Sequence, residues 1–287
     1  MMEVTNKILK DIYKERGPDV KKYDFGLLLV IGGSEFYSGS PAFTAFAAFR
    51  AGVDMVRVIA PKRAADIIAS FSPNLAAYPL KGERLNKEHL PILLSMAESA
   101  KAVSRGNMAI VIGGGTGRSE ETQETILEFL NKVSIPTVVD ADAIHAVAKN
   151  SNVFKGKPFI FTPHGYEFFV LTGKEVIGKP DEEKEKLVKE EAERLGTTIL
   201  LKGHTDFISN GKEIASNKTG SVYMTKGGTG DTLAGIAGAF MARGLDPFSA
   251  GQAAAFINGK AGEIAAKRKR DGLLATDLIE AIPEVFI

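Results

Sequence analysis

Six short apolar runs, most of them bounded by glycine or proline, constrain the fold of this chain more than any other feature. None of them alternates between apolar and polar residues, as a strand with one solvent-facing side does. A continuous apolar run of this length is typical of a strand that is covered on both faces. The sequence therefore predicts buried strands of a mostly parallel sheet at 25–34, 53–61, 108–115, 136–141, 158–163 and 197–203.

Stretches with helical periodicity separate these strands, at 41–51, 61–70, 87–101, 119–132, 142–150 and 181–196. Right-handed strand–helix–strand connections place helices on both faces of a parallel sheet, so we expect a three-layer α/β/α fold. An Asn210-Gly211 turn within 206–217 predicts a β-hairpin, and further helices are expected at 229–243, 247–266 and 274–281. No linker-like tract or repeat interrupts the pattern, which indicates a single domain over residues 1–287.

Charge and composition exclude several classes of protein. A net charge of +1 gives no overall field that favours nucleic acid or an anionic membrane. The chain has no cysteine, which excludes disulfides and thiolate metal sites. The charged N-terminal segment is unlike a signal peptide, and no apolar run approaches the ~18 residues of a transmembrane helix. We therefore expect a soluble cytoplasmic protein. We interpret the basic run 267–270 as the C-terminal end of a helix rather than a binding patch, because cations are favoured at that end.

Polar or glycine-rich segments follow the predicted strands. Because open parallel sheets bind ligands at the carboxyl ends of their strands, we expect these segments to meet at one edge and form an active site. They are GGSEFYSGSP after the first strand, GGGTGRS after the third, DADAIH at the end of the fourth, TPHGYE after the fifth, KGHTD after the sixth, and KGGTGD after the hairpin.

The segment KGGTGDTLAGI at 226–236 is the most informative of them. Its glycines permit backbone conformations that other residues resist, and a helix is expected to begin immediately afterwards. A glycine-rich turn before a helix presents unpaired N–H groups and the positive end of the helix dipole, which suits a phosphate group. Asp231, in the first turn, then supplies a carboxylate base beside that phosphate. The alternative is that Asp231 only caps the helix.

Other candidate residues each have a structural alternative. Asp140 and Asp142 offer oxygen ligands for Mg²⁺, although we expect Asp142 rather to cap the following helix. His164 and Glu167 are spaced so that both can face the sheet edge, unless His164 is an ordinary hydrogen-bonded loop residue. Lys202 directly follows a strand and can reach a nucleotide phosphate, unless its side chain extends into solvent.

Several common site types lack support in this sequence. The glycine-rich segments match neither the G-x-G-x-x-G pattern of dinucleotide oxidoreductases nor the P-loop pattern. There is no cysteine nucleophile, no G-x-S-x-G motif and no histidine pair at metal-ligand spacing, so hydrolase and zinc-enzyme functions are disfavoured.

Taken in order, the same segments resemble the ribokinase-like superfamily, whose signature is a G-x-G-D anion hole that opens a helix. Within that superfamily the chain closely resembles the ADP- or ATP-dependent NAD(P)H-hydrate dehydratase family. The matching stretches cover nearly the whole chain in family order: 16–58, 111–117, 136–144, 162–168, 200–208 and 226–263.

The resemblance implies that the protein repairs hydrated NAD(P)H. ADP or ATP, with Mg²⁺, would phosphorylate the C6 hydroxyl of the S epimer of the hydrate, and phosphate would then be eliminated, with Asp231 as general base. By motif position, the hydrated dinucleotide (NADHX or NADPHX) would contact Ser40, Gly115, His164 and Asp231. The nucleotide site would comprise Lys202, Gly203, His204, Thr205, Asp206, Gly228, Thr229, Gly230 and Asn258. Asp140 and Glu167 are the candidate Mg²⁺ ligands, and family analogy implies a homo-oligomer, specifically a tetramer.

Three positions depart from the family pattern. Ser40 stands where the family commonly has alanine, and TPHGYE replaces the usual T-P-H-P-G-E. Asn258 replaces a histidine, and asparagine can form hydrogen bonds but cannot carry charge. Relatives are often fused to an N-terminal epimerase domain; about two dozen residues precede the first predicted strand here, so we expect no epimerase activity in this chain.

Two other functions stay open at this point. A ribokinase-like kinase of a small vitamin-precursor alcohol, of thiazole, pyrimidine or pyridoxal type, would share the G-x-G-D chemistry but release a stable phosphate ester. A nucleotide-binding sensor without turnover is the non-enzymatic alternative, and the presence of both Asp231 and Lys202 argues against it.

Overall fold

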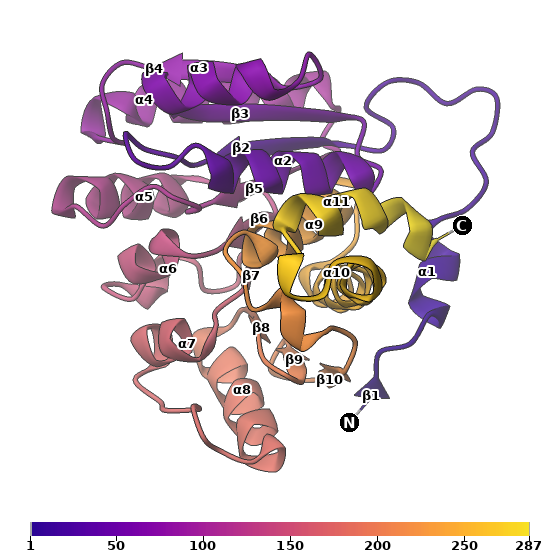
Figure 1. Cartoon of the computed structure of the whole chain (residues 1–287). Coiled ribbons are helices and arrows are strands. Elements are labelled where there is room, and N and C mark those ends of the chain that lie inside the picture. Colours follow the sequence, from indigo (N-terminus) through magenta and orange to yellow (C-terminus); the bar gives the residue numbers. More distant parts are fainter. Residues whose placement is uncertain (1, 287) are drawn as a thin grey trace.

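The computed structural model describes residues 2–286, which form one ten-stranded sheet with helices on both faces (Figure 1). The strands are β1 (Met2–Glu3), β2 (Leu27–Ile31), β3 (Met55–Pro61), β4 (Ala76–Leu80), β5 (Met108–Ile112), β6 (Thr137–Val139), β7 (Phe159–Phe161), β8 (Thr198–Leu201), β9 (Asp206–Ser209) and β10 (Ile214–Asn217).

The helices are α1 (Lys7–Ile12), α2 (Gly39–Arg50), α3 (Lys62–Phe71), α4 (Leu90–Val103), α5 (Glu120–Lys132), α6 (Asp142–Val147), α7 (Gly165–Thr172), α8 (Asp181–Leu195), α9 (Thr229–Ala242), α10 (Pro247–Lys269) and α11 (Ala275–Ala281). Short 3₁₀ turns lie at Lys87–His89, Ser151–Val153, Val222–Met224, Arg270–Gly272 and Ile282–Val285.

The sheet is parallel except for one strand. Its order is β1-β10-β9-β8-β7-β6-β5-β2-β3-β4. The strands from β4 to β8 in this order pair parallel, β9 runs antiparallel to both β8 and β10, and β1 pairs parallel with β10. The carboxyl ends of the parallel strands therefore lie along one edge, which is where such sheets bind ligands.

The central strands are buried on both faces. In β2, Leu28 and Val30 pack into one hydrophobic cluster with residues of α2, α3, α9, α10 and α11. Leu27, Leu29 and Ile31 pack into a second cluster with residues of α4, α5, α6, α7 and α8. Figure 1 shows α5, α6, α7 and α8 one below another on the left, and α2, α9, α10 and α11 grouped together. This arrangement confirms the expected three-layer α/β/α fold, and the absence of alternation in the sequence follows from burial of both faces.

The six strands and the hairpin predicted from the sequence are confirmed, with ends shifted by a few residues. The predicted helix 87–101 begins instead with a 3₁₀ turn before α4, because Pro91 is compatible only with the first turn of an α-helix. The basic run 267–270 lies at the end of α10, as expected.

Four elements were not predicted: β1, β4, α1 and α7. β1 is only two residues long, and β4 is an edge strand that carries Pro79 and is partly exposed, so neither has the apolar pattern of the central strands. α7 begins with a glycine directly after the loop that ends β7, and glycine at that position indicated a loop rather than a helix.

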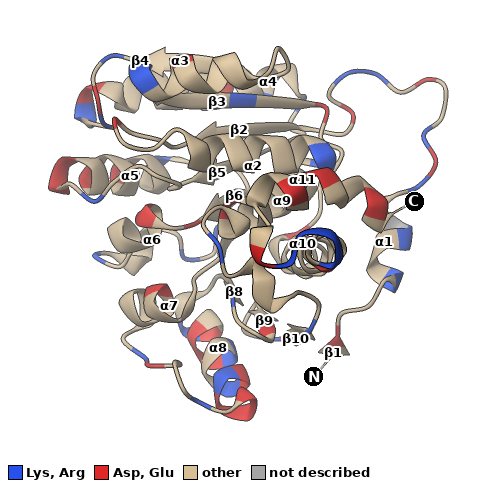
Figure 2. Ribbon diagram, viewed as in Figure 1, with Lys and Arg blue, Asp and Glu red and all other residues tan. Residues whose placement is uncertain are grey.

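Charged side chains of both signs lie along α8, while Val188, Ala192 and Leu195 on the same helix are buried (Figure 2). This agrees with a helix that has one solvated and one packed face. Within the part of the chain that the structure describes, no helix combines the length and the apolar character needed to cross a membrane.

Candidate active site

Hydrogen bonds and an ion pair connect the loops at the carboxyl edge of the sheet: the loop after β2 to that after β5, and the loop after β8 to those after β7 and β6. The Gly33 N–H donates to the carbonyl of Gly114 at 2.8 Å, and the Lys202 N–H donates to the carbonyl of Pro163 at 2.8 Å. The expected convergence of these segments is therefore confirmed, and the beginning of α9 lies beside them.

The first turn of α9 has no side-chain cap. Its N-cap residue is Gly228, whose φ of 97° lies in the left-handed region that glycine adopts without strain. A Cβ on Gly228 would also approach Phe43 and Ala275 to 2.8 Å, so no larger residue fits. The first amides of α9 are thus presented with the positive end of the helix dipole, which suits an anion. The alternative that Asp231 only caps this helix is wrong, because its side chain points elsewhere.

Asp231 contacts Ser40 of α2. The Ser40 hydroxyl donates a hydrogen bond to Oδ1 of Asp231, and a Cβ on Gly114 would lie 3.0 Å from the same oxygen. Burial raises the pKa of Asp231 to about 6, and the nearby carboxylates of Asp140 and Glu167 add to this rise. The Ser40 hydrogen bond and the charge of Lys202 oppose it. At neutral pH Asp231 is therefore mainly ionised, and it is a stronger base than an exposed aspartate.

Lys202 is directed into the protein. Its ammonium lies 3.0 Å from Oδ1 of Asp140 and 3.8 Å from Oε2 of Glu167, and only 20 % of its side chain is exposed. Thr162 donates a further hydrogen bond of 2.8 Å to Oδ1 of Asp140. Burial lowers the pKa of Lys202, but the two carboxylates outweigh this effect, so the net pKa is raised and the lysine is charged. The alternative that Lys202 extends into solvent is wrong.

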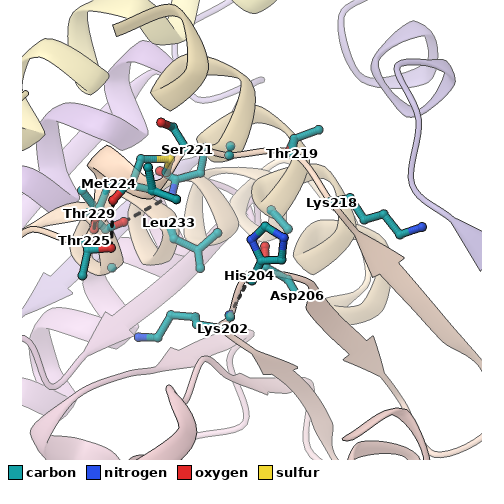
Figure 3. A pocket seen from close by; sticks show the side chains of 17 residues that line it. Lys202, His204, Asp206, Lys218, Thr219, Ser221, Met224, Thr225, Thr229 and Leu233 are labelled. Atoms are coloured by element: carbon teal, nitrogen blue, oxygen red, sulfur yellow. Dashed lines mark hydrogen bonds between the residues drawn. The ribbon is translucent and has the colours of Figure 1, made fainter. Parts of the chain in front are cut away.

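A cavity of about 440 Å³ opens between the β8–β9 connection and the first turns of α9 (Figure 3). Figure 3 shows Lys202, His204 and Asp206 on one side of it and Thr225, Thr229 and Leu233 on another. Seven of the nine predicted nucleotide-site residues line this cavity: Lys202, Gly203, His204, Asp206, Thr229, Gly230 and Asn258. Thr205 and Gly228 do not line it; Thr205 is buried, and Gly228 packs against Phe43.

Asn258 and Asp206 hold the walls of the cavity in place. Asn258 on α10 accepts a hydrogen bond from Thr232 at 2.7 Å and donates to the carbonyl of Thr229 at 3.3 Å, which fixes the first turn of α9. Asp206 accepts hydrogen bonds of 3.0 Å from the Gly203 N–H and from Asn217. Burial raises the pKa of Asp206 to about 6, against the effect of these two donors.

His164 is the N-cap residue of α7. Its Nδ1 accepts hydrogen bonds from the amides of Tyr166 at 3.2 Å and Glu167 at 3.3 Å, while Glu167 accepts from the His164 N–H at 2.9 Å. The His164 side chain is 53 % exposed at the sheet edge. The departure TPHGYE therefore leaves a regular capped helix, in which Gly165 and Tyr166 are the first two residues.

The prediction for Asp142 is wrong. The residue before α6 is Ala141, which has a φ of 51°, and Asp142 makes no cap. Its carboxylate instead accepts hydrogen bonds from the Gly117 N–H at 2.9 Å and from Arg118 at 2.7 Å. Asp142 thereby anchors the glycine-rich loop after β5, in which Gly115 has a φ of 68° and lies against Tyr37.

Three residues near Asp231 were missed by the sequence analysis. Gly114 lies against Ser40 and Asp231, Thr162 binds Asp140, and Thr44 donates to the carbonyls of Ser40 at 3.1 Å and Asp231 at 3.2 Å. The GGGTG run singled out the loop that contains Gly114, but nothing local distinguishes the two threonines from other buried threonines.

Carboxylates that could bind a metal gather around Lys202. Asp140 and Glu167 both approach its ammonium, but nowhere in residues 2–286 do three or more acidic or histidine side chains form a group able to hold a metal ion. A divalent ion at this position would therefore need oxygen ligands from a bound phosphate group as well.

Comparisons with known proteins identify the family of this chain. A family model described as NAD(P)H-hydrate dehydratase matches residues 28–284. The bifunctional NAD(P)H-hydrate repair enzyme of Pyrobaculum aerophilum is 43% identical over 94% of this chain and 52% of its own length. The ADP-dependent (S)-NAD(P)H-hydrate dehydratase of Cenarchaeum symbiosum is 35% identical over 94% of this chain and 92% of its own length.

Solved structures show the same fold. The ADP/ATP-dependent NAD(P)H-hydrate dehydratase of Bacillus subtilis, co-crystallised with ATP/Mg²⁺, has a TM-score of 0.79 and 23% identity, over 99% of this chain and 97% of its own. A ribokinase-like superfamily protein of Enterococcus faecalis has a TM-score of 0.83 and 25% identity, over 99% of this chain and 95% of its own. This likeness confirms the expected ribokinase-like fold.

The chain spans about half the length of the bifunctional relatives that it matches, and nearly all of the C. symbiosum protein. The family model covers all strands from β5 to β10, the glycine-rich loops and α9. The chain therefore belongs to the NAD(P)H-hydrate dehydratase family.

Proposed function

We propose that this protein catalyses the nucleotide-dependent dehydration of hydrated NAD(P)H. In this reaction the C6 hydroxyl of the S epimer of NADHX or NADPHX is phosphorylated, and elimination of phosphate then regenerates NADH or NADPH. The names of the relatives support this reaction class for the family. The geometry around Asp231 supports it for this chain.

The position of Asp231 between two surfaces is the observation on which the proposal rests. On one side are Ser40 and the glycine loop at Gly114. On the other are Gly230 and Lys202, which line the cavity; a Cβ on Gly230 would lie 3.3 Å from the Lys202 ammonium. A nucleotide in the cavity and a hydroxyl on the glycine loop would meet at this carboxylate.

The first step is phosphoryl transfer. Asp231 accepts the proton of the C6 hydroxyl as general base while the oxygen attacks the terminal phosphorus of the nucleotide. The bond from that phosphorus to its bridging oxygen breaks, so AMP leaves when ADP is the donor and ADP leaves when ATP is the donor. The uncapped amides and the dipole at the start of α9 stabilise the negative charge of the transferring group, and Lys202 adds a positive charge. Most of the catalysis in such a transfer comes from positioning and electrostatics.

The second step is elimination. Hydroxide is a poor leaving group and phosphate is a good one. The lone pair of the ring nitrogen expels phosphate from C6, and loss of a proton from C5 restores the double bond of the dihydronicotinamide ring. The protein must exclude water from C6 during this step.

The donor set near Lys202 fits Mg²⁺ bound together with a nucleotide. Asp140 and Glu167 offer carboxylate oxygens, and Mg²⁺ commonly uses one or two carboxylates plus phosphate oxygens and water. The ion would neutralise part of the phosphate charge. We propose ADP or ATP as the phosphoryl donor, and we retain the family-based expectations of a homo-tetramer and a cytoplasmic location.

The decisive experiment follows NADPH itself. Purified protein, Mg²⁺ and acid-hydrated NADPH are mixed with ADP or with ATP, and absorbance is measured where intact NADPH absorbs and the hydrate does not. A rise that requires nucleotide supports the dehydratase, and the faster reaction identifies the donor. No rise, although nucleotide binds, would contradict the proposal and point to a vitamin-precursor kinase or a sensor.

A further inference from the structure

Ser40 and Asp231 are joined directly, although 191 positions separate them in the chain. Ser40 lies in the first turn of α2, and Asp231 lies in the first turn of α9. The hydroxyl donates to Oδ1 of the carboxylate, so Oδ2 is the oxygen that does not contact Ser40.

The packing of α2 against α9 fixes this contact. Thr44 of α2 donates to the carbonyl of Asp231 at 3.2 Å and to that of Ser40 at 3.1 Å. One turn further along α9, Gly235 lies so close to the backbone of Thr44 that a Cβ there would overlap it. The first turns of α2 and α9 are therefore held side by side, which keeps the Ser40 hydroxyl within reach of the carboxylate.

The remaining charged groups around Asp231 come from other elements. Asp140 at the end of β6 and Glu167 of α7 repel the ionised carboxylate, while Lys202 after β8 attracts it. Lys202 is itself held by Asp140 and Glu167. Ser40 is thus a side chain that donates a direct hydrogen bond to Asp231, and a hydrogen bond to a charged acceptor is stronger than one between neutral groups.

We infer that Ser40 is a positioning residue for the proposed reaction: its hydroxyl occupies Oδ1 of Asp231, directs Oδ2 toward the hydroxyl of the substrate and stabilises the carboxylate as an anion. The expected effect on kcat rests on the proposed function, because Asp231 is the general base of that reaction. The structural part of the inference, a hydrogen bond that stabilises ionised Asp231, is independent of the substrate.

The test compares Ser40→Ala with Ser38→Ala. Ser38 is the N-cap residue of α2 but makes no side-chain capping bond, so its variant removes a nearby hydroxyl without affecting the carboxylate. For each protein, kcat and KM for the NADPH hydrate are measured from pH 5 to pH 9, and nucleotide affinity is measured by calorimetry.

Loss of the donor removes stabilisation of the ionised carboxylate, so the pKa of Asp231 rises in Ser40→Ala. We expect kcat at pH 7 to fall about ten-fold and the acidic limb of the profile to move up by about one pH unit. KM and nucleotide affinity should stay within about two-fold of the wild type, because a group that acts only on the base does not contribute to ground-state binding of either ligand. Ser38→Ala behaves as the wild type.

Two results would overturn the inference. One is a higher KM for the hydrate with kcat and the acidic limb unchanged, which would make Ser40 only a substrate contact. The other is an unchanged profile in every respect.

A spectroscopic measurement separates this inference from the proposed function. The side-chain carboxyl of Asp231 is titrated by ¹³C NMR in the wild type and in Ser40→Ala, with the signal assigned by its loss in Asp231→Asn. A higher midpoint in Ser40→Ala supports the inference even if the protein dehydrates no hydrate, and an equal midpoint refutes it even if the dehydratase is active.

Discussion

The ammonium of Lys202 lies 3.0 Å from Oδ1 of Asp140, where β6 and β8 end on either side of β7. Only 4 % of the Asp140 side chain is exposed, so the pair is largely withdrawn from water. An ion pair in such a position costs desolvation on both sides, and removal of one partner leaves an uncompensated charge. The same lysine lines the cavity assigned to the nucleotide. It therefore connects the stability of the sheet edge with phosphate binding.

Lys202→Ala should weaken nucleotide binding more than hydrate binding. Loss of one charged contact to phosphate raises the nucleotide Kd by about ten- to one hundred-fold. The free energy of unfolding should also fall by about 3 kcal/mol, because Asp140 remains buried without its partner. Calorimetric titration with ADP and with the hydrate, together with urea denaturation, measures these effects.

The double variant Lys202→Met, Asp140→Asn separates the two effects. It removes both charges, so stability should recover most of the loss while nucleotide affinity stays low. If the single variant weakens both ligands equally, Lys202 does not lie at the phosphates. Recovery of nucleotide affinity in the double variant would also contradict the assignment.

Asp231→Asn should lose about two to four orders of magnitude in kcat, the usual contribution of a positioned general base. The asparagine keeps an oxygen that can accept the Ser40 hydrogen bond, so the helix ends stay in place. Nucleotide affinity should remain within about three-fold of the wild type, because the cavity walls are intact. Single-turnover formation of NADPH measures the loss, and near-normal turnover would remove Asp231 from the mechanism.

The same substitution should stabilise the protein, and the gain should depend on pH. The pKa of Asp231 is about 6 in the folded protein and 3.8 as its ordinary value. The folded state therefore holds this proton more tightly. That contribution to stability is complete below pH 3.8 and is lost as the pH rises through about 6.

At pH 7.5 the ionised carboxylate lowers the free energy of unfolding of the wild type by about 2–3 kcal/mol. A neutral asparagine does not have this cost. Asp231→Asn should hence have a higher Tm than the wild type at pH 7.5 and nearly the same Tm at pH 4. Thermal unfolding of both proteins at the two pH values tests this. Asp206 is present in both proteins, so its titration cancels when their Tm values are compared. A gain that is equal at both pH values would show that ionisation of Asp231 is not the cause.

Gly230→Ala should fold normally but bind nucleotide poorly. The backbone at Gly230 is helical, and the new Cβ would lie 3.3 Å from the ammonium of Lys202. A shift of a few tenths of an ångström at the end of this side chain relieves that contact, so the strain on the fold is small. The methyl group would, however, occupy the wall that faces the cavity, and we expect the nucleotide Kd to rise by at least about ten-fold.

Gly227→Ala is the matched control, since a Cβ there has no neighbour within 4 Å. Its nucleotide affinity and Tm should equal those of the wild type. Equal nucleotide affinity in the two variants would mean that the phosphates do not approach the start of α9.

The sequence alone predicted the strands of the central sheet because each is a continuous apolar run, a pattern that burial on both faces requires. It also predicted Asp231 at the start of a helix, since glycine positions and helix periodicity are local properties of the chain. The resemblance to a known family then indicated which polar residues to examine, and seven of the nine nucleotide-site residues do line one cavity.

Local signals failed where partners are distant. Asp142 has the position of a helix cap, but its hydrogen bonds go to Gly117 and Arg118, across a neighbouring loop. His164 and Glu167 have the spacing of a capping box, yet the helix they cap was missed because Gly165 and the preceding proline indicated a loop. β4 was missed because an edge strand needs no continuous apolar run.

What the sequence by itself determined is the type and order of the elements, because apolar periodicity and backbone preference act within a few residues. Only the tertiary structure decided that the hydroxyl of Ser40 meets Asp231 and that Lys202 turns inward to Asp140. Those contacts depend on how closely α2 approaches α9, which the absence of a side chain at Gly235 permits, and on which strands are neighbours in the sheet. Such distances are set by packing between segments that lie far apart in the chain.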